Sequence, residues 1–593
     1  MSTTLIKRQY TDLAGVDFKN SENLVNLNRS PDALNVYKDY LSEGVCIQTR
    51  PGLKLIGQIG EKINGLYVYK NTKALIHSKN TLYLWNNFPD TPQTQVLRTD
   101  MNDTRTSFFM LNDKLYINDG VNYLVYDGTL RNVSEDAYIP TTTIARSPSG
   151  GGEEYQDVNV LTGYRKNQFC ADGTSKDYYL DCVDIDEVET VWVNDVATTA
   201  YTVNLTLGKI TFTTAPSKPG LDGQDNVVVL FKKEIEEYNT RIGKCTISLS
   251  FDNRAFFSGN INFPNAVFHS ELNNPAYISD LNYYQDGSAD NQIKDMTVGN
   301  NILWVFKESN QNGSTIFYHI PTIDSTLGKI YPSKQGNVST GCYSKCTNFY
   351  DDIVFLSRNG LEGITGDISE EQLLSHRSSL IDNKLINTNN YHNAQIEEWR
   401  GYLLVFSDNY IFLADSRQKF EGINGIEYEW YLWDISKSNP SILKEYNGEL
   451  FVGGKDGKIY MLDGTNDNGE IIQSYWTTPL DAFGYSNKLK TTNKRGGIAK
   501  IKIIPNGIIK IAEKTNKKQQ KEITSKSLNG FSYVDFNYDD FSYMSTNDSY
   551  ITYKIKEKKF IELSIKFYSD ELNKPFGLYG ATIEAFVGGY VKR

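Results

Sequence analysis

The sequence has no long apolar run. No stretch approaches the roughly 20 apolar residues that a membrane-spanning helix needs. The opening residues MSTTLIKRQY lack the apolar stretch of a secretory signal peptide. We therefore expect a soluble protein that has no membrane span and does not follow the usual secretory route.

Cysteine is scarce and scattered. The six cysteines are Cys46, Cys170, Cys182, Cys245, Cys342 and Cys346. None forms a C-x-x-C pair, and the C-x-x-x-C spacing of the last two has no nearby His or Cys to complete a zinc site. We expect reduced and mostly buried thiols, as in a protein assembled in the cytosol.

Sequence motifs of catalysis are also missing. The five histidines, which are His77, His269, His319, His376 and His392, lie far apart and none belongs to an H-E-x-x-H motif. There is no G-x-S-x-G nucleophile turn and no G-x-x-x-x-G-K-[ST] phosphate loop. The S-x-D-x-G-x-x-W repeat of many propeller glycosidases is absent, and no carboxylate pair can be singled out among 72 Asp and Glu residues. We expect no enzyme, and we assign no catalytic residue, no cofactor, no cofactor-binding residue and no metal ligand.

One acidic stretch, DGTNDNGE (Asp463 to Glu470), is loosely similar to a calcium loop but lacks the twelve-residue ligand spacing. A plain turn between domains is the favoured interpretation. The formal net charge is −11, which argues against a protein that grips nucleic acid through a basic surface. The short basic stretch from Lys514 to Lys521 is interpreted as a solvated hairpin tip.

What the sequence has in abundance is strand signals. Aromatic residues make up 13% of the chain, and the 40 tyrosines suit sheets with one buried and one wet face. One unit recurs, in which an alternating apolar strand, a polar turn and a second strand follow each other. The copies lie at Ile63–Asn87, Thr106–Thr129, Ile247–Asn260, Met296–Ser309, Phe349–Gly366, Trp399–Asp415 and Glu445–Gly464. This spacing predicts an all-β protein, a β-propeller of about seven blades.

Two interruptions of the repeat suggest further domains. After Ile144 comes a linker with Gly150 to Gly152, followed by a different strand pattern that ends near Lys233. We interpret it as a β-sandwich inserted into a propeller loop, and the pattern after Gly464 as a C-terminal β-sandwich. The expected domains are 1–145 (propeller, first part), 146–235 (insert), 236–466 (propeller, second part) and 467–593 (C-terminal β domain).

Two local structures are also expected. The segment from Ile368 to Leu385 predicts a helix, with Ser369 as its cap, Gln372 three residues later, and Leu373, Leu380 and Leu385 on one face. The strand pieces before Gly57 are expected to pair with the last blade, near Gly448 to Gly464, because this seals the ring and removes an exposed edge.

The stretch from Tyr10 to Gly57 carries the most specific motifs. It contains Ala14-Gly15-Val16-Asp17, then SPDALNV (Ser30 to Val36), then Thr49-Arg50-Pro51-Gly52. A second passage reads FFSGNINFPNAVFHSELNNPAYISDLNYY (Phe256 to Tyr284). Together they resemble the tailed-bacteriophage propeller proteins known as packaged-DNA stabilisation, tail-nozzle or tail-ring components. The resemblance extends over about the first 465 residues.

This resemblance implies a structural virion protein. Such a chain would form a ring of about six or twelve copies in the portal–tail region. It would join the connector to distal tail parts, retain packaged DNA and line its exit channel without sequence-specific binding. Assembly would take place in the bacterial host cytoplasm. A receptor- or glycan-binding tail protein is the alternative, since abundant Tyr also suits sugar stacking.

The individual motif residues can also be interpreted as residues that serve only the folding of the first blade. Asp32 is expected to cap a turn that begins at Ala33. Pro51-Gly52 is expected to form a type II turn, which needs a positive φ at Gly52.

Overall fold

A computed structural model describes residues 4–40, 45–311, 313–325, 328–336, 339–364, 374–422, 425–492, 498–503, 508–527 and 550–591. The chain divides into two compact units. The first unit comprises residues 1–74, 85–94 and 343–593, and the second comprises residues 75–84 and 95–342. Within the described residues the α-helices are only four residues long, so the fold is all-β as expected. They are α1 (Tyr238–Arg241) and α2 (Asp382–Leu385).

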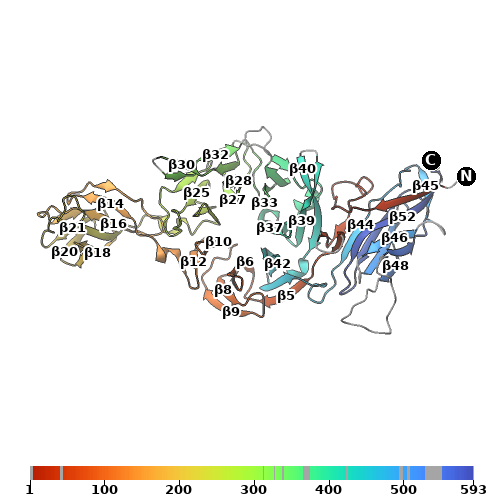
Figure 1. The fold of residues 1–593 in the computed structure, drawn as a ribbon, viewed down its shortest axis with the longest axis horizontal. Coiled ribbons are helices and arrows are strands. Elements are labelled where there is room, and N and C mark those ends of the chain that lie inside the picture. The colour runs from red at the N-terminus through yellow and green to blue at the C-terminus, as the bar shows by residue number, and fades with distance from the viewer. Residues whose placement is uncertain are drawn as a thin grey trace. The chain divides into compact units, whose positions relative to one another are not determined.

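Seven four-stranded sheets follow one another along the described chain, which confirms the predicted propeller of about seven blades (Figure 1). The first is β6 (Ile63–Tyr69), β7 (Lys73–Ser78), β8 (Thr81–Asn86) and β9 (Gln93–Arg98). The blades of the second unit contain β10 (Ser107–Leu111), β11 (Lys114–Asn118), β12 (Tyr123–Tyr126), β13 (Leu130–Asn132); β23 (Ile247–Phe251), β24 (Arg254–Ser258), β25 (Ala266–His269), β26 (Tyr283–Gln285); and β27 (Ile293–Gly299), β28 (Ile302–Lys307), β29 (Ile316–His319), β32 (Ser333–Gly336). A hairpin of β30 (Thr322–Asp324) and β31 (Gly328–Ile330) extends the last of these blades.

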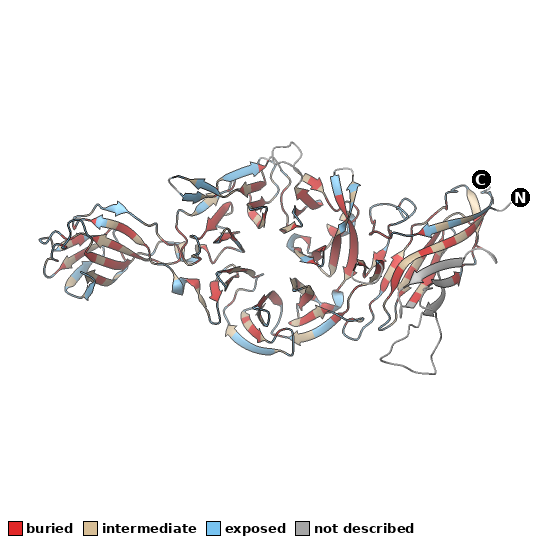
Figure 2. Cartoon of the chain, viewed as in Figure 1, coloured by how far each residue is buried: buried red, intermediate tan, exposed pale blue. Residues whose placement is uncertain are grey.

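The blades of the first unit contain β33 (Cys346–Phe349), β34 (Asp352–Ser357), β35 (Gly360–Ile364), β36 (Leu374–His376); β37 (Gln395–Trp399), β38 (Tyr402–Ser407), β39 (Tyr410–Gly422), β40 (Gly425–Asp434); and β41 (Pro440–Tyr446), β42 (Glu449–Gly454), β43 (Lys458–Leu462), β5 (Leu53–Gln58). Middle strands of the blades are mostly buried, whereas the outer strand β9 is largely exposed (Figure 2).

Tight hairpins join neighbouring strands within the blades, as the polar pairs predicted. Asn112 and Asp113 have φ values of 53° and 58°, and Asn447 and Gly448 have values of 52° and 82°. Two successive positive φ angles are typical of the type I′ turn, whose twist matches that of the flanking strands. Short residues that tolerate this conformation therefore set the pairing of neighbouring strands within each blade.

The last blade takes its outer strand from near the start of the chain. β5 pairs antiparallel with β43, and Gly57 lies opposite Ile459. The predicted closure is therefore confirmed for the strand that contains Gly57. The earlier stretch takes another course, since Val16 N donates to Trp430 O at 2.8 Å in the neighbouring blade.

The C-terminal region forms a β-sandwich that includes the opening strands. One sheet contains β1 (Thr4–Tyr10), β3 (Val36–Asp39), β4 (Cys46–Thr49), β45 (Lys488–Thr491), β46 (Ile498–Ile503), β49 (Tyr550–Lys554), β50 (Lys558–Phe560) and β52 (Gly577–Tyr590). The other contains β2 (Ala33–Leu34), β44 (Ser474–Thr477), β47 (Ile508–Thr515), β48 (Lys518–Ser527) and β51 (Leu563–Ser569). The expected assignment of 1–145 to the propeller is therefore wrong for β1, β2, β3 and β4, which pair within the sandwich sheets. The alternation of apolar and polar residues predicts a strand, but it does not indicate which other strand pairs with it.

The insert has two sheets of its own. One contains β14 (Thr141–Arg146), β15 (Glu153–Glu154), β16 (Tyr164–Phe169), β18 (Glu187–Val193), β19 (Val196–Thr198) and β22 (Val227–Lys232), and the other contains β17 (Asp177–Tyr179), β20 (Tyr201–Asn204) and β21 (Lys209–Phe212) (Figure 1). The first strand begins at Thr141, before the expected boundary at 146. The glycines Gly150 to Gly152 lie in a loop between β14 and β15, so they are part of the insert and not a linker that leads into it.

The predicted helix from Ile368 to Leu385 is wrong for residues 374–381 and holds only for the last turn. Leu374–His376 is β36, the outer strand of a blade, and only Asp382–Leu385 is helical. Pairing with β35 completes the sheet and overrides the local helical pattern. The expected cap Ser369, and Gln372 and Leu373, lie outside the described residues.

Candidate functional site

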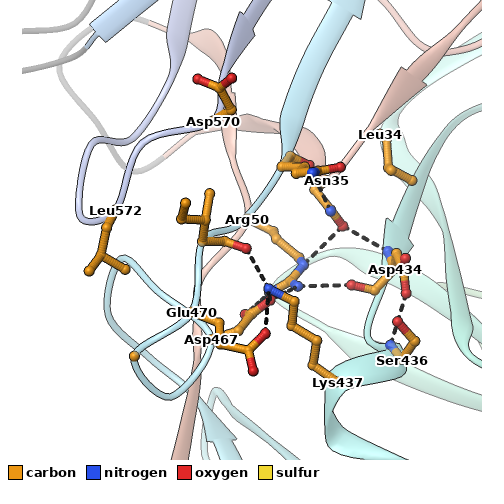
Figure 3. Close-up of a pocket in the computed structure, with 13 residues that line it drawn as sticks. Leu34, Asn35, Arg50, Asp434, Ser436, Lys437, Asp467, Glu470, Asp570 and Leu572 are labelled. Carbon is orange, nitrogen blue, oxygen red and sulfur yellow. Dashed lines mark hydrogen bonds and ion pairs between the residues drawn. The ribbon is translucent and has the colours of Figure 1, made fainter.

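Motif residues from the opening stretch meet at a buried ion pair in the first unit. The Arg50 guanidinium binds the Asp467 carboxylate through two hydrogen bonds of 2.8 Å, and these side chains are only 1% and 3% exposed (Figure 3). Arg50 also donates to Asn35 Oδ1 at 3.0 Å and to Asp434 O at 2.8 Å. A buried charge needs such full pairing, because an unpaired buried charge would lower the stability of the fold by several kcal/mol.

Asn35 links three parts of this site. Its side-chain oxygen also accepts a hydrogen bond from Asp434 N at 2.7 Å, and its Nδ2 donates to Gln473 O at 2.9 Å. Its backbone N donates to Leu432 O, and its own carbonyl accepts Arg50 N. One asparagine therefore joins the opening segment to β40 and to the start of the C-terminal sandwich.

The turn at Gly52 is not the expected type II turn. Gly52 has no positive φ, so the conformational reason proposed for the glycine was wrong. The glycine is required by close approach instead, since an added Cβ would lie 2.0 Å from Asn466 O. Gly52 N donates to Gly464 O, and Asp463 N donates to Gly52 O. The stretch from Asp463 to Glu470 thus forms a turn that receives Arg50 and Gly52.

Other motif residues hold the same segment against the blades. Gly15 lies so close to β40 that a Cβ would be 2.6 Å from Trp430 N. Asp17 Oδ1 accepts the backbone N–H groups of Lys19 and Asn20, which fixes a turn. Asp32 does not cap a helical turn, because Ala33–Leu34 is β2. These residues serve the fold of the opening segment.

A second ion pair in this region was not predicted. Arg29 Nε lies 3.0 Å from both carboxylate oxygens of Glu429, and its guanidinium lies 4.1 Å from the Phe420 ring centroid. Burial raises the pKa of Glu429, and the charge and hydrogen bonds of Arg29 oppose that rise. The two partners are 400 positions apart, and the sequence has no signal that pairs them.

A recess of about 730 Å³ opens beside the buried Arg50–Asp467 pair. Lys437 lies within it and donates to Glu470 Oε2 at 3.1 Å and to Ile471 O at 2.5 Å (Figure 3). Other carboxylates in the lining belong to Asp434 and Asp570. The described lining includes Ser436 and Lys437 but no His, Cys or Tyr.

The second family-like passage, Phe256 to Tyr284, folds into one blade of the second unit. Ser258 Oγ donates to Ala266 O, and Asn260 Nδ2 donates to Arg241 O. Asn265 Nδ2 donates to Gly287 O at 2.7 Å. These polar side chains satisfy backbone carbonyls in the turns of the blade, which is a structural role.

The same unit contains a buried histidine–aspartate pair. His319 Nε2 lies 3.0 Å from Asp286 Oδ2, and Ser333 Oγ donates to the other carboxylate oxygen. Burial lowers the pKa of His319, but the hydrogen bond and charge of Asp286 outweigh it and the net pKa is raised. The Ser333 hydroxyl and the His319 ring both bind Asp286, so the histidine is not placed as a base for the serine.

Within the described residues, no group of three or more His, Cys, Asp or Glu side chains could hold a metal ion. The six cysteines are free thiols, four of them buried. No helix among the described residues is long and apolar enough to cross a membrane.

No protein-family model matches the sequence, and no curated protein matches it. Solved structures match at low identity. BamB from Moraxella catarrhalis is 10% identical, with a TM-score of 0.33 over 73% of this chain and 97% of that one. The Nup170 N-terminal domain of Chaetomium thermophilum, in complex with Nup53, is 8% identical, with a TM-score of 0.32 over 70% and 64%. The β-propeller domain of Myceliophthora thermophila Cps50 (Swd1) is 8% identical, with a TM-score of 0.26 over 68% and 97%.

Proposed function

We propose that this chain is a structural component of a tailed-phage virion. It forms a ring of about six or twelve copies in the portal–tail region, joins the connector to distal tail parts, retains packaged DNA and lines its exit channel. The proposal rests on the resemblance of two passages, Tyr10–Gly57 and Phe256–Tyr284, to phage propeller proteins.

The observation that carries the proposal is the role of the motif residues. Asn35, Arg50 and Gly52 fasten the opening segment to the blades and to the C-terminal sandwich. A subunit that transmits force between its neighbours in a ring needs an opening segment, blades and sandwich that are held firmly to one another. The net charge of −11 suits a channel wall that does not bind passing DNA. Both features fit a passive structural part better than an enzyme.

Deletion of the gene in the phage tests this proposal. We expect particles that lack distal tail parts or leak their genome, and restoration by the wild-type gene supplied in trans. Purified protein should show no turnover on host glycans and only weak, non-specific binding to duplex DNA. Particles that assemble fully, retain DNA and only fail to adsorb would instead support the receptor- or glycan-binding alternative.

A further inference from the structure

The insert and the C-terminal region carry opposite net charges. Residues 146–235 contain 8 Lys and Arg against 14 Asp and Glu, an acidic excess of six. Residues 467–593 contain 20 Lys and Arg against 14 Asp and Glu, a basic excess of six. The overall net charge of −11 hides this asymmetry. Opposite charges on separate domains of one chain favour head-to-tail contact between copies.

The basic charge includes a row of exposed lysines on the sandwich. Lys554, Lys556 and Lys558 alternate with the buried residues Tyr553, Ile555 and Glu557, so they point away from the core. Lys559 is also exposed. None of the four ammonium groups forms an ion pair within the described residues, although this chain pairs many other surface lysines. We call these four residues the lysine edge.

An exposed aromatic side chain, that of Tyr590, lies near the lysine edge. Strand β45 connects the two, because Thr491 pairs with Lys558 and Lys488 pairs with Tyr590. Tyr590 is 73% exposed, and Lys488 Nζ lies 5.2 Å from its ring centroid. Tyrosine is enriched at protein-binding surfaces relative to the rest of a protein surface.

One end of the insert offers the complementary chemistry. Val183, Leu205 and Leu207 are 57%, 43% and 51% exposed. They adjoin one another, because the backbone N–H groups of Asp184 and Ile185 donate to the carbonyls of Thr206 and Leu205. Four exposed carboxylates follow Val183 within six residues of the chain, and none forms an ion pair with a described lysine or arginine. These are Asp184, Asp186, Glu187 and Glu189, and with the three apolar residues they form what we call the acidic end.

We propose that the acidic end of one copy docks on the lysine edge of the next copy. The carboxylates meet the lysines, and Val183, Leu205 and Leu207 cover Tyr590 and its surroundings. The two faces differ, so the contact is heterologous and repeats from copy to copy, as a ring requires. This inference deepens the ring assembly proposed above by naming its two surfaces.

Paired charge reversals in the full-length protein test the docking. One variant carries E187K and E189K in the acidic end, and the other carries K556E and K558E in the lysine edge. Self-association is measured by sedimentation over a wide concentration range at about 0.05 M and about 0.5 M salt. We expect wild-type association to weaken in high salt, and each variant alone to associate at least about tenfold more weakly than wild type.

Mixing the two variants gives the decisive result. In alternating subunits, the unchanged acidic end of one variant meets the unchanged lysine edge of the other, and the reversed residues 187 and 189 meet the reversed residues 556 and 558. Oligomers of alternating subunits should therefore recover. The matched controls E153K/E154K and K517E/K574E reverse exposed charges elsewhere on the same two domains and should associate like wild type. Wild type that stays monomeric throughout, variants that associate normally, or a mixture that shows no recovery would overturn the docking.

A duplex of about 30 base pairs is the competing ligand, since a lysine row also suits phosphates. Duplex binding that is lost in K556E/K558E, without self-association of the wild type, would assign the edge to nucleic acid and overturn the docking. The ring proposal fails separately, through the phage deletion. Normal particles without this gene would remove the virion role even if the two surfaces bind each other.

Discussion

The insert and the C-terminal sandwich are both additions to a propeller, but they are attached in different ways. The insert has its own core, with Phe169, Tyr178 and Phe231 fully buried among residues of the insert alone. The sandwich shares one continuous core with the blades of the first unit, which includes Trp433 and Phe567. A domain that has its own hydrophobic core can be removed without unfolding the rest. A domain that shares its core with the blades folds together with them.

Removal of the C-terminal sandwich should have the largest effect. Truncation after Thr465 would remove the partners of β1 and β2, separate the β3–β4 hairpin from β52, and leave Arg50 without Asp467. We expect insoluble protein or loss of the cooperative unfolding transition, measured by expression tests and urea denaturation. A truncated chain that unfolds cooperatively at the wild-type midpoint would show that the sandwich is as separable as the insert.

Breaking the buried ion pair should cost less than truncation but still destabilise strongly. Arg50→Met leaves the buried Asp467 carboxylate with only the more distant Lys437 Nζ, at 4.0 Å, as a cationic partner, which should lower the free energy of unfolding by about 3 kcal/mol. The double variant R50M/D467L removes both charges and should recover part of that loss. Urea denaturation measures all three proteins. Equal stability of the single and double variants would contradict the argument from a buried carboxylate that has lost its main partner.

Matched core truncations compare the two additions directly. Phe169→Ala in the insert and Phe567→Ala in the sandwich each remove a fully buried ring, which costs about 3–5 kcal/mol locally. We expect F169A to lower a separate transition of the insert and F567A to lower the transition of the first unit. Hydrogen exchange resolved by peptide distinguishes these outcomes. Loss of protection throughout the chain in F169A would show that the insert is not independent.

Sequence reasoning found the local features of both regions and missed the long-range ones. The blades were predictable because pairs such as Asn112-Asp113 encode their hairpins within a few residues. The pairing of β1 with β52 was not, because the partner strands lie at opposite ends of the chain. Gly52 was noticed for the wrong reason, since its neighbour Asn466 is brought close only by the fold.

The ion pair shows the same limit at the candidate site. Arg50 was part of a motif, and Asp467 lay in a stretch considered as a turn or a calcium loop. Nothing in the sequence links them across 417 positions, among 72 acidic residues. Local patterns therefore predicted which segments matter, and only the structure shows how they meet.

The pH dependence of stability should differ between the two regions. His376, in the first unit, is bound by Glu362 at 3.0 Å and Asp382 at 2.7 Å; burial lowers its pKa, but these carboxylates outweigh burial and raise it to about 10. A raised pKa gives stability that is complete below 6.5 and is lost as pH rises towards 10. The insert contains no histidine.

His376→Gln isolates this effect. The difference in unfolding free energy between wild type and H376Q should shrink between pH 6.5 and about 8, by at most about 1.4 kcal/mol per pH unit. Lys490, whose pKa is lowered to about 8 by burial, is present in both proteins, so its effect cancels from this difference. The insert should keep its own stability over the same interval. A difference that is constant with pH would show that His376 stays in one protonation state.

The smallest effect should come from removing the insert, provided that one anchor stays. Residues 157–162 return to the neighbouring blade, where Asn159 is fully buried, its Nδ2 donates to Tyr138 O and Ala276 O, and its Oδ1 accepts Ile278 N. The chain crosses into the insert at two narrow places. Gln156 N donates to Thr141 O, and Lys233 N donates to Gly163 O.

These crossings allow a double excision. Residues 141–156 and 163–234 are each replaced by a short Gly-Ser link, which leaves 157–162 on the blade. Because this excision removes the separate core of the insert completely, we expect the free energy of unfolding of the blades to fall by less than about 1 kcal/mol. Simple excision of 141–235 also removes Asn159 and its hydrogen bonds, and should cost about 2–3 kcal/mol more. Urea denaturation of both proteins provides the comparison. Equal losses in the two proteins would mean that Asn159 is no anchor, and a large loss in both would mean that the insert supports the blades after all.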